Sequence, residues 1–379
     1  ATTPHDLTIC FLECINAGAE AFAVAAQDLL YDADIVRFSN TIGTNTIIQR
    51  DGSKVGLIVT KGTENLFSAP TDNGDSALVH VNMVKGMDKA VSTDGLVEGE
   101  PDAEIVLETA QELIDQGARC LVVALANAEI NPANERAVRR IIKAEYPRDY
   151  LGSVPVFLSS DISTRSGLQQ RMNTAVLNAY IHAKLSRLLY KAGEDLRQHE
   201  YRGTLFINHN NGTVARVAKT RAVNTYNSGP AGGLLGACEL GKSYGLNNII
   251  STDMGGTSFD IAYVCDGSPS YSLEPDIEGF TCNLPMLSIR ALGTGGGSIA
   301  SVNGSGVKVG PMSAGALPGP AAYNLGGSQP TVTDANLILG VLDPDFFLGG
   351  SMPLHVDRAS SVIDEVIARP LGLAVEQAA

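Results

Sequence analysis

The decapeptide Ser251 to Asp260, "STDMGGTSFD", places a glycine pair between aspartates and hydroxyl side chains. The apolar run "NNII" precedes it and "IAYV" follows it, so the pattern predicts two strands joined by a tight turn. The ordinary explanation of Gly255 and Gly256 is that glycine supplies the positive φ of such a turn. The alternative is a phosphate site, because backbone N–H groups, hydroxyls and carboxylates would converge at one hairpin tip.

Each residue type of the hairpin has a role in the phosphate interpretation. Gly255 and Gly256 carry no Cβ atom, so phosphate oxygens can approach the main chain, and the hydroxyls of Thr257 and Ser258 can donate to the same oxygens. A carboxylate can hold Mg²⁺ through its waters. The candidate catalytic residues are therefore Asp253 and Asp260, with Asp253 also the candidate magnesium ligand.

Outward from the hairpin, strand patterns alternate with helix patterns. Strands are predicted at 34–40, 55–60, 118–126, 153–160 and 204–210, and helices at 15–30, 105–117, from 131, 171–199 and 232–245. This order favours parallel βαβ units. The long helix over 171–199 is expected to mark a boundary between two α/β lobes, 1–200 and 201–379. The Gly- and Pro-rich remainder to Gly350 predicts loops and short strands around a site, and 69–104 predicts a polar connection.

Composition narrows the classes of partner. The chain has 379 residues, enough for about two domains, and its net charge of −14 argues against nucleic acid or an anionic lipid surface as the main partner. Its apolar runs, such as Cys120 to Ala126, are far shorter than the roughly 20 residues of a membrane helix, so no membrane contact is expected. The six cysteines form no C-x-x-C pair, which favours buried thiols over a metal cluster. No basic leader is visible, so export is not supported and a reducing cytoplasm is expected.

Four further features each have two interpretations. The run Gly295, Gly296 and Gly297 in "GTGGGS" is a second anion-binding nest or a flexible turn. The glycines of "SGPAGG" aim helix N–H groups at an anion or allow close helix packing. Asp334 is an acid, base or metal-water ligand, or else a helix N-cap. His209 in "NHNNG" contacts a substrate or belongs to a solvated polar turn.

Beyond these residues, the chain resembles the hydantoinase A and 5-oxoprolinase family, which includes the ATP-binding subunits of acetone and acetophenone carboxylases. The segments that carry the resemblance are "NTIGTNTIIQRDGSKVGLIVTKG" (40–62), "NPANERAV" (131–138), "TAVLNAY" (174–180), "SGPAGGLLGA" (228–237), "TDMGGTSFDIAYV" (252–264), "GTGGGSIA" (293–300), "VGPMSAGALPGPAAY" (309–323) and "PTVTDANLILGVLDP" (330–344). They are distributed along most of the chain, from residue 40 to residue 344, and a series in this order is highly specific.

The resemblance implies an actin-like ATPase (ribonuclease H-like) fold, in which two α/β lobes enclose a nucleotide cleft. In it "DMGGTS" is similar to the second phosphate-binding loop, so Asp253, Gly255, Gly256, Thr257 and Ser258 would contact Mg-phosphate. The cofactors implied are ATP and Mg²⁺. The family usually has Ser or Thr where this chain has Phe259, which replaces one hydroxyl by an apolar ring.

Two family segments are not found in this sequence. The family usually has a D-x-G-G-T-type first phosphate loop ahead of a segment like "TTPHDLT", and a glycine-rich, adenosine-holding region after one like "PLGLAVEQAA". The expectation is a fold that is incomplete at both ends. Three explanations stay open: the chain is a portion of a longer polypeptide, another subunit supplies these pieces, or the protein is a scaffold that no longer binds ATP well.

The resemblance implies one of two reactions with a common scheme. ATP phosphorylates an unreactive oxygen, and a second step consumes the activated species. In ketone carboxylases the activated species are bicarbonate and a ketone enol, and in hydantoinases and oxoprolinase a ring amide. The segments 37–56 and 215–233 and Phe259 look more like the carboxylases. Both alternatives imply a second large catalytic subunit. Small subunits, and a transition metal in a partner subunit, are compatible with both. A non-catalytic ATPase-like scaffold is the competing class, and the many family-specific segments weaken a sugar kinase.

Overall fold

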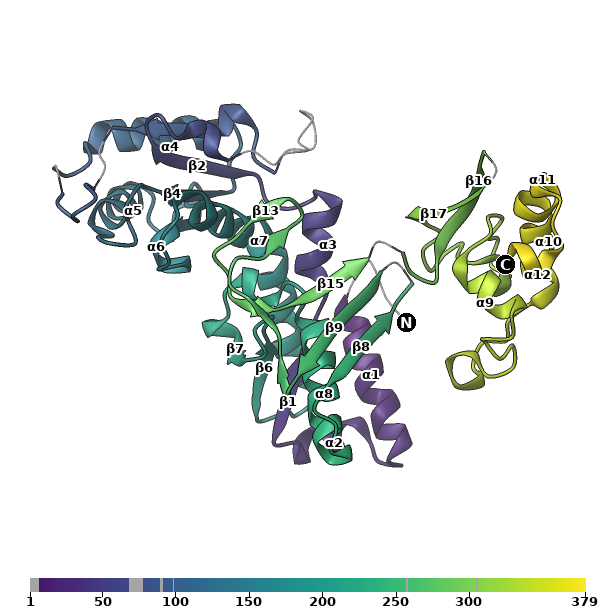
Figure 1. Cartoon of the computed structure of the whole chain (residues 1–379). Coiled ribbons are helices and arrows are strands. Elements are labelled where there is room, and N and C mark those ends of the chain that lie inside the picture. The colour runs from purple at the N-terminus through teal and green to yellow at the C-terminus, as the bar shows by residue number, and fades with distance from the viewer. Residues whose placement is uncertain are drawn as a thin grey trace. The chain divides into compact units, whose positions relative to one another are not determined.

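The computed structural model describes residues 7–67, 78–88, 91–97, 99–256, 258–292, 294–304 and 306–379 (Figure 1). They form two compact units, the first comprising Ala1–Leu235 and Tyr271–Leu287 and the second comprising Gly236–Ser270 and Ser288–Ala379. The division falls inside helix α8 (Ser228–Tyr244) and not at residue 200. The units therefore differ from the expected lobes, whose assignment stays a prediction.

The first unit contains a four-stranded parallel sheet in the order β3-β2-β4-β5. Its strands are β2 (Val55–Thr60), β3 (Val84–Met87), β4 (Cys120–Ala124) and β5 (Val156–Leu158). Helices α4 (Ala103–Asp115) and α5 (Ala133–Glu145) connect them in sequence and pack against each other. All of β4 is buried, as expected for the centre of a parallel sheet. The predicted βαβ units are confirmed.

The long helix is also confirmed, as α7 (Leu168–Gln198), which packs against β2, β4 and β5. A second, three-stranded sheet joins β1 (Ile35–Phe38) in parallel to β6 (Thr204–Asn208), which pairs antiparallel with β7 (Val214–Arg216). The remaining helices of four or more residues in the described part of this unit are α1 (Leu7–Ala21), α2 (Ala26–Asp32), α3 (Ile42–Gln49), α6 (Ser159–Ile162) and η5 (Ala222–Thr225).

The single helix predicted over 15–30 is wrong. The chain breaks between α1 and α2, where Ala23 adopts φ 54°, a left-handed conformation that interrupts a right-handed helix. Among the described residues no single helix is long and apolar enough to cross a membrane, and α1 and α2 reach that length only as a pair bent by 92°. Of the polar connection expected over 69–104, residues 69–77, 89, 90 and 98 lie outside the described residues.

A buried ionic network ties the ends of β4 and β5 to helices α5, α6 and α7. Arg171 and Glu135 are fully buried. The Arg171 guanidinium donates to Ser159 Oγ at 2.9 Å and pairs with Glu129. Glu135 accepts from the hydroxyls of Ser159 and Ser160, each at 2.6 Å. Because these bonds satisfy both charges, the network supports the fold and leaves no free group for chemistry.

The second unit is built on an antiparallel sheet in which β9 (Phe259–Cys265) pairs with β8 (Ile249–Met254), β10 (Ser268–Pro269) and β15 (Ile289–Leu292). A separate hairpin joins β16 (Ser298–Asn303) to β17 (Gly306–Ser313). The C-terminal elements are α9 (Val332–Ile338), α10 (Val356–Ile363), the π-helix η8 (Asp364–Ala368), α11 (Arg369–Leu371) and α12 (Val375–Ala378). The predicted strand, turn and strand over 249–265 are confirmed.

Candidate functional site

The β8–β9 hairpin brings two carboxylates together at its tip. The register pairs Asp253 with Asp260 and Met254 with Phe259, and the Gly255 N–H donates to the Ser258 carbonyl at 2.9 Å. Directly opposed residues of an antiparallel pair have Cβ atoms about 4.5–5.5 Å apart, so the two acids are neighbours on one face of the sheet. Thr257 lies outside the described residues, and its predicted role stays a prediction.

The two acids differ in exposure. Asp253 is exposed and Asp260 is partly buried. Burial, followed by the negative charge of Asp253, raises the pKa of the Asp260 carboxyl above its ordinary value. A cation beside the pair would offset both causes of the raised pKa. Its positive charge compensates the solvation that Asp260 loses on burial and the repulsion between the two like charges.

The described residues contain no group of three or more His, Cys, Asp or Glu side chains that could hold a metal ion. A metal at the hairpin would therefore have only these two carboxylates as acidic ligands, with other oxygens completing its shell. Mg²⁺ is commonly bound in this way, by one or two carboxylates plus substrate phosphates and water. The donor set fits Mg²⁺ bound together with a phosphate group.

The glycine pair leaves the tip of the hairpin open. Neither Gly255 nor Gly256 has a positive φ, so the explanation of this pair by a left-handed turn is wrong. A Cβ atom added at Gly256 would meet no atom within 4 Å, and at Gly255 only the Ser258 carbonyl oxygen, at 3.7 Å. Among the described residues the Gly256 N–H has no hydrogen-bond partner. An exposed donor beside open space fits an approaching phosphate oxygen.

The second glycine run lies directly against the hairpin. The Gly296 N–H donates to the Gly255 carbonyl at 2.8 Å, and the Gly297 N–H donates to the Gly256 carbonyl at 2.7 Å. The Gly295 N–H donates to Ser298 Oγ at 2.8 Å. All three N–H groups are thus engaged within the protein. This geometry favours a supporting role for the run, and its predicted role as an anion nest stays a prediction.

The contact between the two loops requires glycine. A Cβ atom at Gly297 would lie 2.8 Å from the Gly256 carbonyl oxygen and 2.9 Å from Ser313 Oγ, and one at Gly296 would lie 2.8 Å from Thr333 Oγ1. Thr333 fixes the run from behind, because its N–H and its hydroxyl both donate to the Gly296 carbonyl, at 2.7 and 2.8 Å. The sequence carried no signal for Ser313 or Thr333, which join the site only through the fold.

Asp334 is not a free acid, and the prediction that it is the N-cap of α9 is wrong, because Thr331 is the N-cap and Asp334 is the third residue of the helix. It is fully buried at the start of α9, where its carboxylate accepts from the backbone N–H groups of Ala321, Ala322 and Thr331 and from the Thr331 hydroxyl. Thr331 Oγ1 accepts in turn from the Asp334 N–H, which completes a capping box. The N-cap region is therefore stabilised by Asp334, and the interpretation of this residue as an acid or base finds no support.

The solvated turn expected around His209 is wrong. This side chain is only 6% exposed, and its ring nitrogens contact the hydroxyls of Thr213 and Thr220 at 3.3 and 3.2 Å. Burial lowers the pKa of His209, so the ring is neutral at pH 7 and stabilises the β6–β7 turn. For "SGPAGG", a Cβ atom at Gly229 or Gly233 would meet nothing within 4 Å, so close packing does not require these two glycines.

Fold and site together define a mixed α/β protein with a glycine-rich, doubly acidic hairpin suited to Mg-phosphate. A model of the hydantoinase/oxoprolinase family matches residues 171–379, and a model of the hydantoinase/oxoprolinase N-terminal region matches residues 1–146. The chain belongs to the hydantoinase/oxoprolinase family. The resemblance inferred from the sequence segments is confirmed.

The relatives include both kinds of enzyme expected. Over its whole length the chain is 37% identical to the acetophenone carboxylase gamma subunit of Aromatoleum aromaticum and 31% identical to the caprolactamase subunit alpha of Pseudomonas jessenii, covering 54% and 56% of these proteins. A nucleotide-free structure of acetone carboxylase matches with a TM-score of 0.84 at 28% identity, over all of this chain and 56% of that one. The ATP-dependent caprolactamase structure matches with a TM-score of 0.81 at 30% identity and the same coverage. The chain thus spans about half the length of the relatives it matches.

Proposed function

We propose that this chain is the ATP-binding part of an ATP-dependent ketone carboxylase of the acetone or acetophenone carboxylase type. The observation that carries the proposal is the hairpin tip, where the carboxylates of Asp253 and Asp260 are opposed and the Gly256 N–H has no partner within the described part of the chain. The identity of 37% to an acetophenone carboxylase subunit, against 31% to a caprolactamase subunit, favours the carboxylase chemistry.

The fold we propose for the whole protein is actin-like. In that assignment the β8–β9 hairpin is the second phosphate-binding loop and the run Gly295 to Gly297 holds it in place. Two features support this: the strand, glycine turn and strand geometry, and the hydrogen bonds from Gly296 and Gly297 to the hairpin carbonyls. The structure of an ATP-dependent enzyme, caprolactamase, also matches the full chain.

ATP supplies the phosphoryl group that turns bicarbonate and a ketone enol into reactive species. The residues of this chain position that group. Asp253, the more exposed acid, would hold Mg²⁺ through water, and Asp260 would add the second negative charge that attracts the cation. The Gly256 N–H and the Ser258 hydroxyl would donate to phosphate oxygens. These interactions strengthen as charge develops on the transferring group, which is the condition for catalysis and not only for binding.

A partner is part of the proposal. The curated relatives include proteins named as gamma, alpha and beta subunits, so we propose a second large catalytic subunit, with ketone and bicarbonate as small-molecule substrates and the cytoplasm as location. The residues that distinguish a ketone from a cyclic amide are expected outside the hairpin, since the phosphate chemistry is common to both reactions.

The test measures ATP hydrolysis by the purified protein together with its co-purifying subunits. Acetone and acetophenone are each supplied with bicarbonate in one arm, and caprolactam, hydantoin and 5-oxoproline in the other. The proposal predicts ADP formation that depends on both ketone and bicarbonate. Stimulation by a lactam or hydantoin alone would replace it with the second candidate, an ATP-dependent cyclic amide hydrolase, which the caprolactamase match favours. No stimulation in either arm, with no ATP binding, would favour the scaffold alternative.

A further inference from the structure

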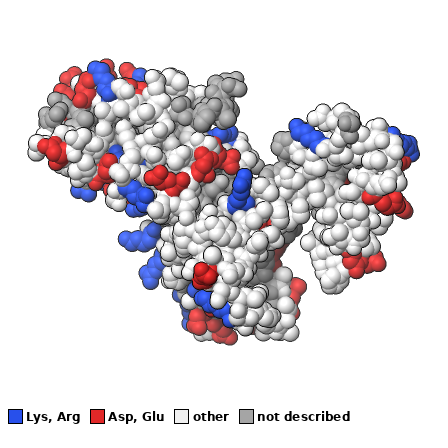
Figure 2. All heavy atoms as spheres, in the orientation of Figure 1, with Lys and Arg blue, Asp and Glu red and all other residues white. Residues whose placement is uncertain are grey.

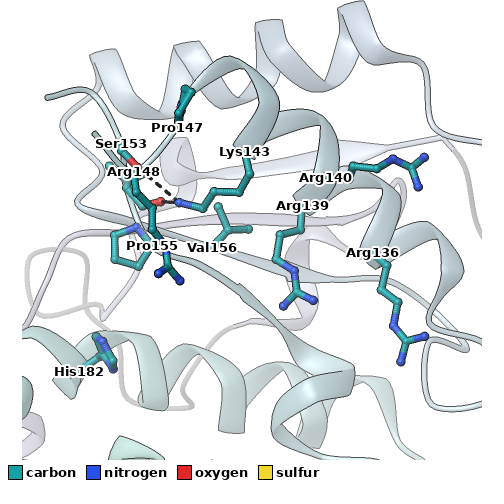
Figure 3. A pocket seen from close by; sticks show the side chains of 11 residues that line it. Arg136, Arg139, Arg140, Lys143, Pro147, Arg148, Ser153, Pro155, Val156 and His182 are labelled. Carbon is teal, nitrogen blue, oxygen red and sulfur yellow. Dashed lines mark hydrogen bonds between the residues drawn. The ribbon is translucent and has the colours of Figure 1, made fainter. Parts of the chain in front are cut away.

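A basic pocket lies in the first unit, remote in sequence from the hairpin. Helix α5, the loop after it, the start of β5 and helix α7 line a cavity of about 990 Å³ (Figure 3). Its titratable lining residues are Arg136, Arg139, Arg140, Lys143, Arg148 and His182. None of them has a role in the proposed phosphoryl-transfer chemistry.

Four basic residues of α5 lie on one face of the helix, although their like charges repel one another. Arg136, Arg139, Arg140 and Lys143 follow the spacing i, i+3, i+4 and i+7, which places them side by side. Like charges at i,i+4 destabilise a helix, and Arg136–Arg140 and Arg139–Lys143 are two such pairs. The chain as a whole carries a net charge of −14, and on the face drawn in Figure 2 basic and acidic side chains are interspersed. The basic residues of α5 are thus concentrated on one helix face of a chain that is acidic as a whole.

Acidic side chains compensate only part of this charge. Arg139 pairs with Asp161 at 2.5 Å and Arg140 with Glu100 at 3.4 Å. Arg136 and Arg148 form no ion pair among the described residues.

Lys143 likewise lacks an acidic partner in the described part of the chain. Its ammonium group donates to the Val154 carbonyl at 2.7 Å. Burial, followed by the charge of Arg148, lowers the pKa of Lys143. A bound anion would relieve this repulsion, because it would lie between two cations that now face each other without a counter-charge.

The pocket has the shape and chemistry of a ligand site. In Figure 3 the side chains of Arg139 and Arg148 extend into the space above His182, whereas Arg140 extends away from them. His182 packs edge-on against Phe157 with ring centroids 4.9 Å apart, and burial lowers its pKa, so its neutral ring can donate one N–H. Pro147, Pro155 and Val156 supply an apolar wall. Known small-molecule sites span about 300–1,000 Å³.

We propose that this basic pocket binds a phosphate-bearing anion of the di- or triphosphate type, at a site distinct from the hairpin. Guanidinium groups bind phosphate oxygens through paired N–H donors, and several of them around one cavity suit a ligand with more than one phosphate. A single orthophosphate would leave most of this volume unfilled. The phosphates can belong to a nucleotide or to inorganic polyphosphate, and the two sources are separated by experiment.

The experiment titrates inorganic tripolyphosphate into the purified protein, without Mg²⁺, by isothermal calorimetry. The double variant Arg136→Gln/Arg148→Gln should bind at least 10-fold more weakly, because both cations lack an acidic partner. The matched control, Arg197→Gln, removes an arginine of α7 that lies outside this pocket and should change affinity less than 2-fold. Thermal unfolding checks that the folds are unchanged, and His182→Gln provides a single-site variant that should weaken binding several-fold.

Two further arms decide the outcome. ATP binding at least 10-fold tighter than tripolyphosphate, and lost in Arg136→Gln/Arg148→Gln, would identify a nucleotide as the ligand of the pocket. Equal affinity that is lost in the same variant would identify the phosphate chain alone. Succinate should not bind. Absent binding of tripolyphosphate, binding unaffected by the double variant, or equal binding of succinate would each overturn the proposal.

Discussion

Replacement of Gly297 by alanine should disrupt the hairpin without touching any group proposed to meet phosphate. The added Cβ would lie 2.8 Å from the Gly256 carbonyl oxygen and 2.9 Å from Ser313 Oγ. A gap of 2.8 Å to a backbone oxygen is shorter than any ordinary carbon–oxygen contact, so the two loops must separate. The separation would also stretch the 2.7 Å hydrogen bond from the Gly297 N–H to the same oxygen.

The cost follows from these two effects. Overpacking a tight site costs about 1–3 kcal/mol, and a lost hydrogen bond about 0.5–1.5 kcal/mol. The expected loss in the free energy of unfolding is therefore about 1.5–4.5 kcal/mol. Urea unfolding followed by circular dichroism measures it, and ATP turnover should fall in parallel because the hairpin tip shifts.

The matched control is Gly256→Ala, on the other side of the same contact. Its Cβ would meet no atom within 4 Å, so stability should stay within about 0.5 kcal/mol of the parent, as for ordinary surface substitutions. The methyl group would nevertheless stand where phosphate is proposed to approach, so nucleotide affinity should fall. Equal stability of both variants would refute the loop-packing argument. Unchanged nucleotide affinity of Gly256→Ala would refute the placement of phosphate.

Three further predictions concern single carboxylates. Asp253→Ala should lower ATP turnover by at least about 10²-fold, the scale for loss of a key electrostatic group, and turnover equal to the parent would refute the assignment. Asp260 has a raised pKa, so the folded state holds its proton more tightly than the unfolded chain does and stability falls as pH rises through the folded pKa. In denaturation experiments without Mg²⁺, Asp260→Asn should therefore raise the free energy of unfolding more at pH 7 than at pH 3. An equal effect at both pH values would contradict this. Glu129→Gln should cost about 3–5 kcal/mol in unfolding free energy, since it leaves the buried Arg171 without its ion-pair partner, and a loss below about 1 kcal/mol would show that the ion pair is dispensable.

The sequence predicted the parts of the fold that depend on local pattern. Strand β2 at 55–60, the long helix α7 and the β8–β9 hairpin follow from apolar periodicity and turn residues, which act over a few positions. The break at Ala23 escaped prediction because alanine is an excellent helix former and nothing local requires its positive φ. The return of 271–287 to the first unit was not predicted either, since it depends on long-range packing.

The candidate site was predicted in its residues but not in their interactions. The glycine pair and the two acids were identified from their types and order. The hydrogen bonds from Gly296 and Gly297 to the hairpin carbonyls could not be predicted, because residue spacing does not indicate which distant loops bond to each other through their backbones. For the same reason Thr333 and Ser313 were missed, and His209, placed in a polar "NHNNG" turn, was expected in solvent although its fold buries it.

The most direct test of the central claim measures ATP hydrolysis by the purified protein with its co-purifying subunits, in the presence of acetone or acetophenone. The account predicts ADP formation that requires both ketone and bicarbonate and that is lost in Asp253→Ala. Hydrolysis that responds to caprolactam, hydantoin or 5-oxoproline and not to ketone with bicarbonate would contradict the claim that this chain serves a ketone carboxylase.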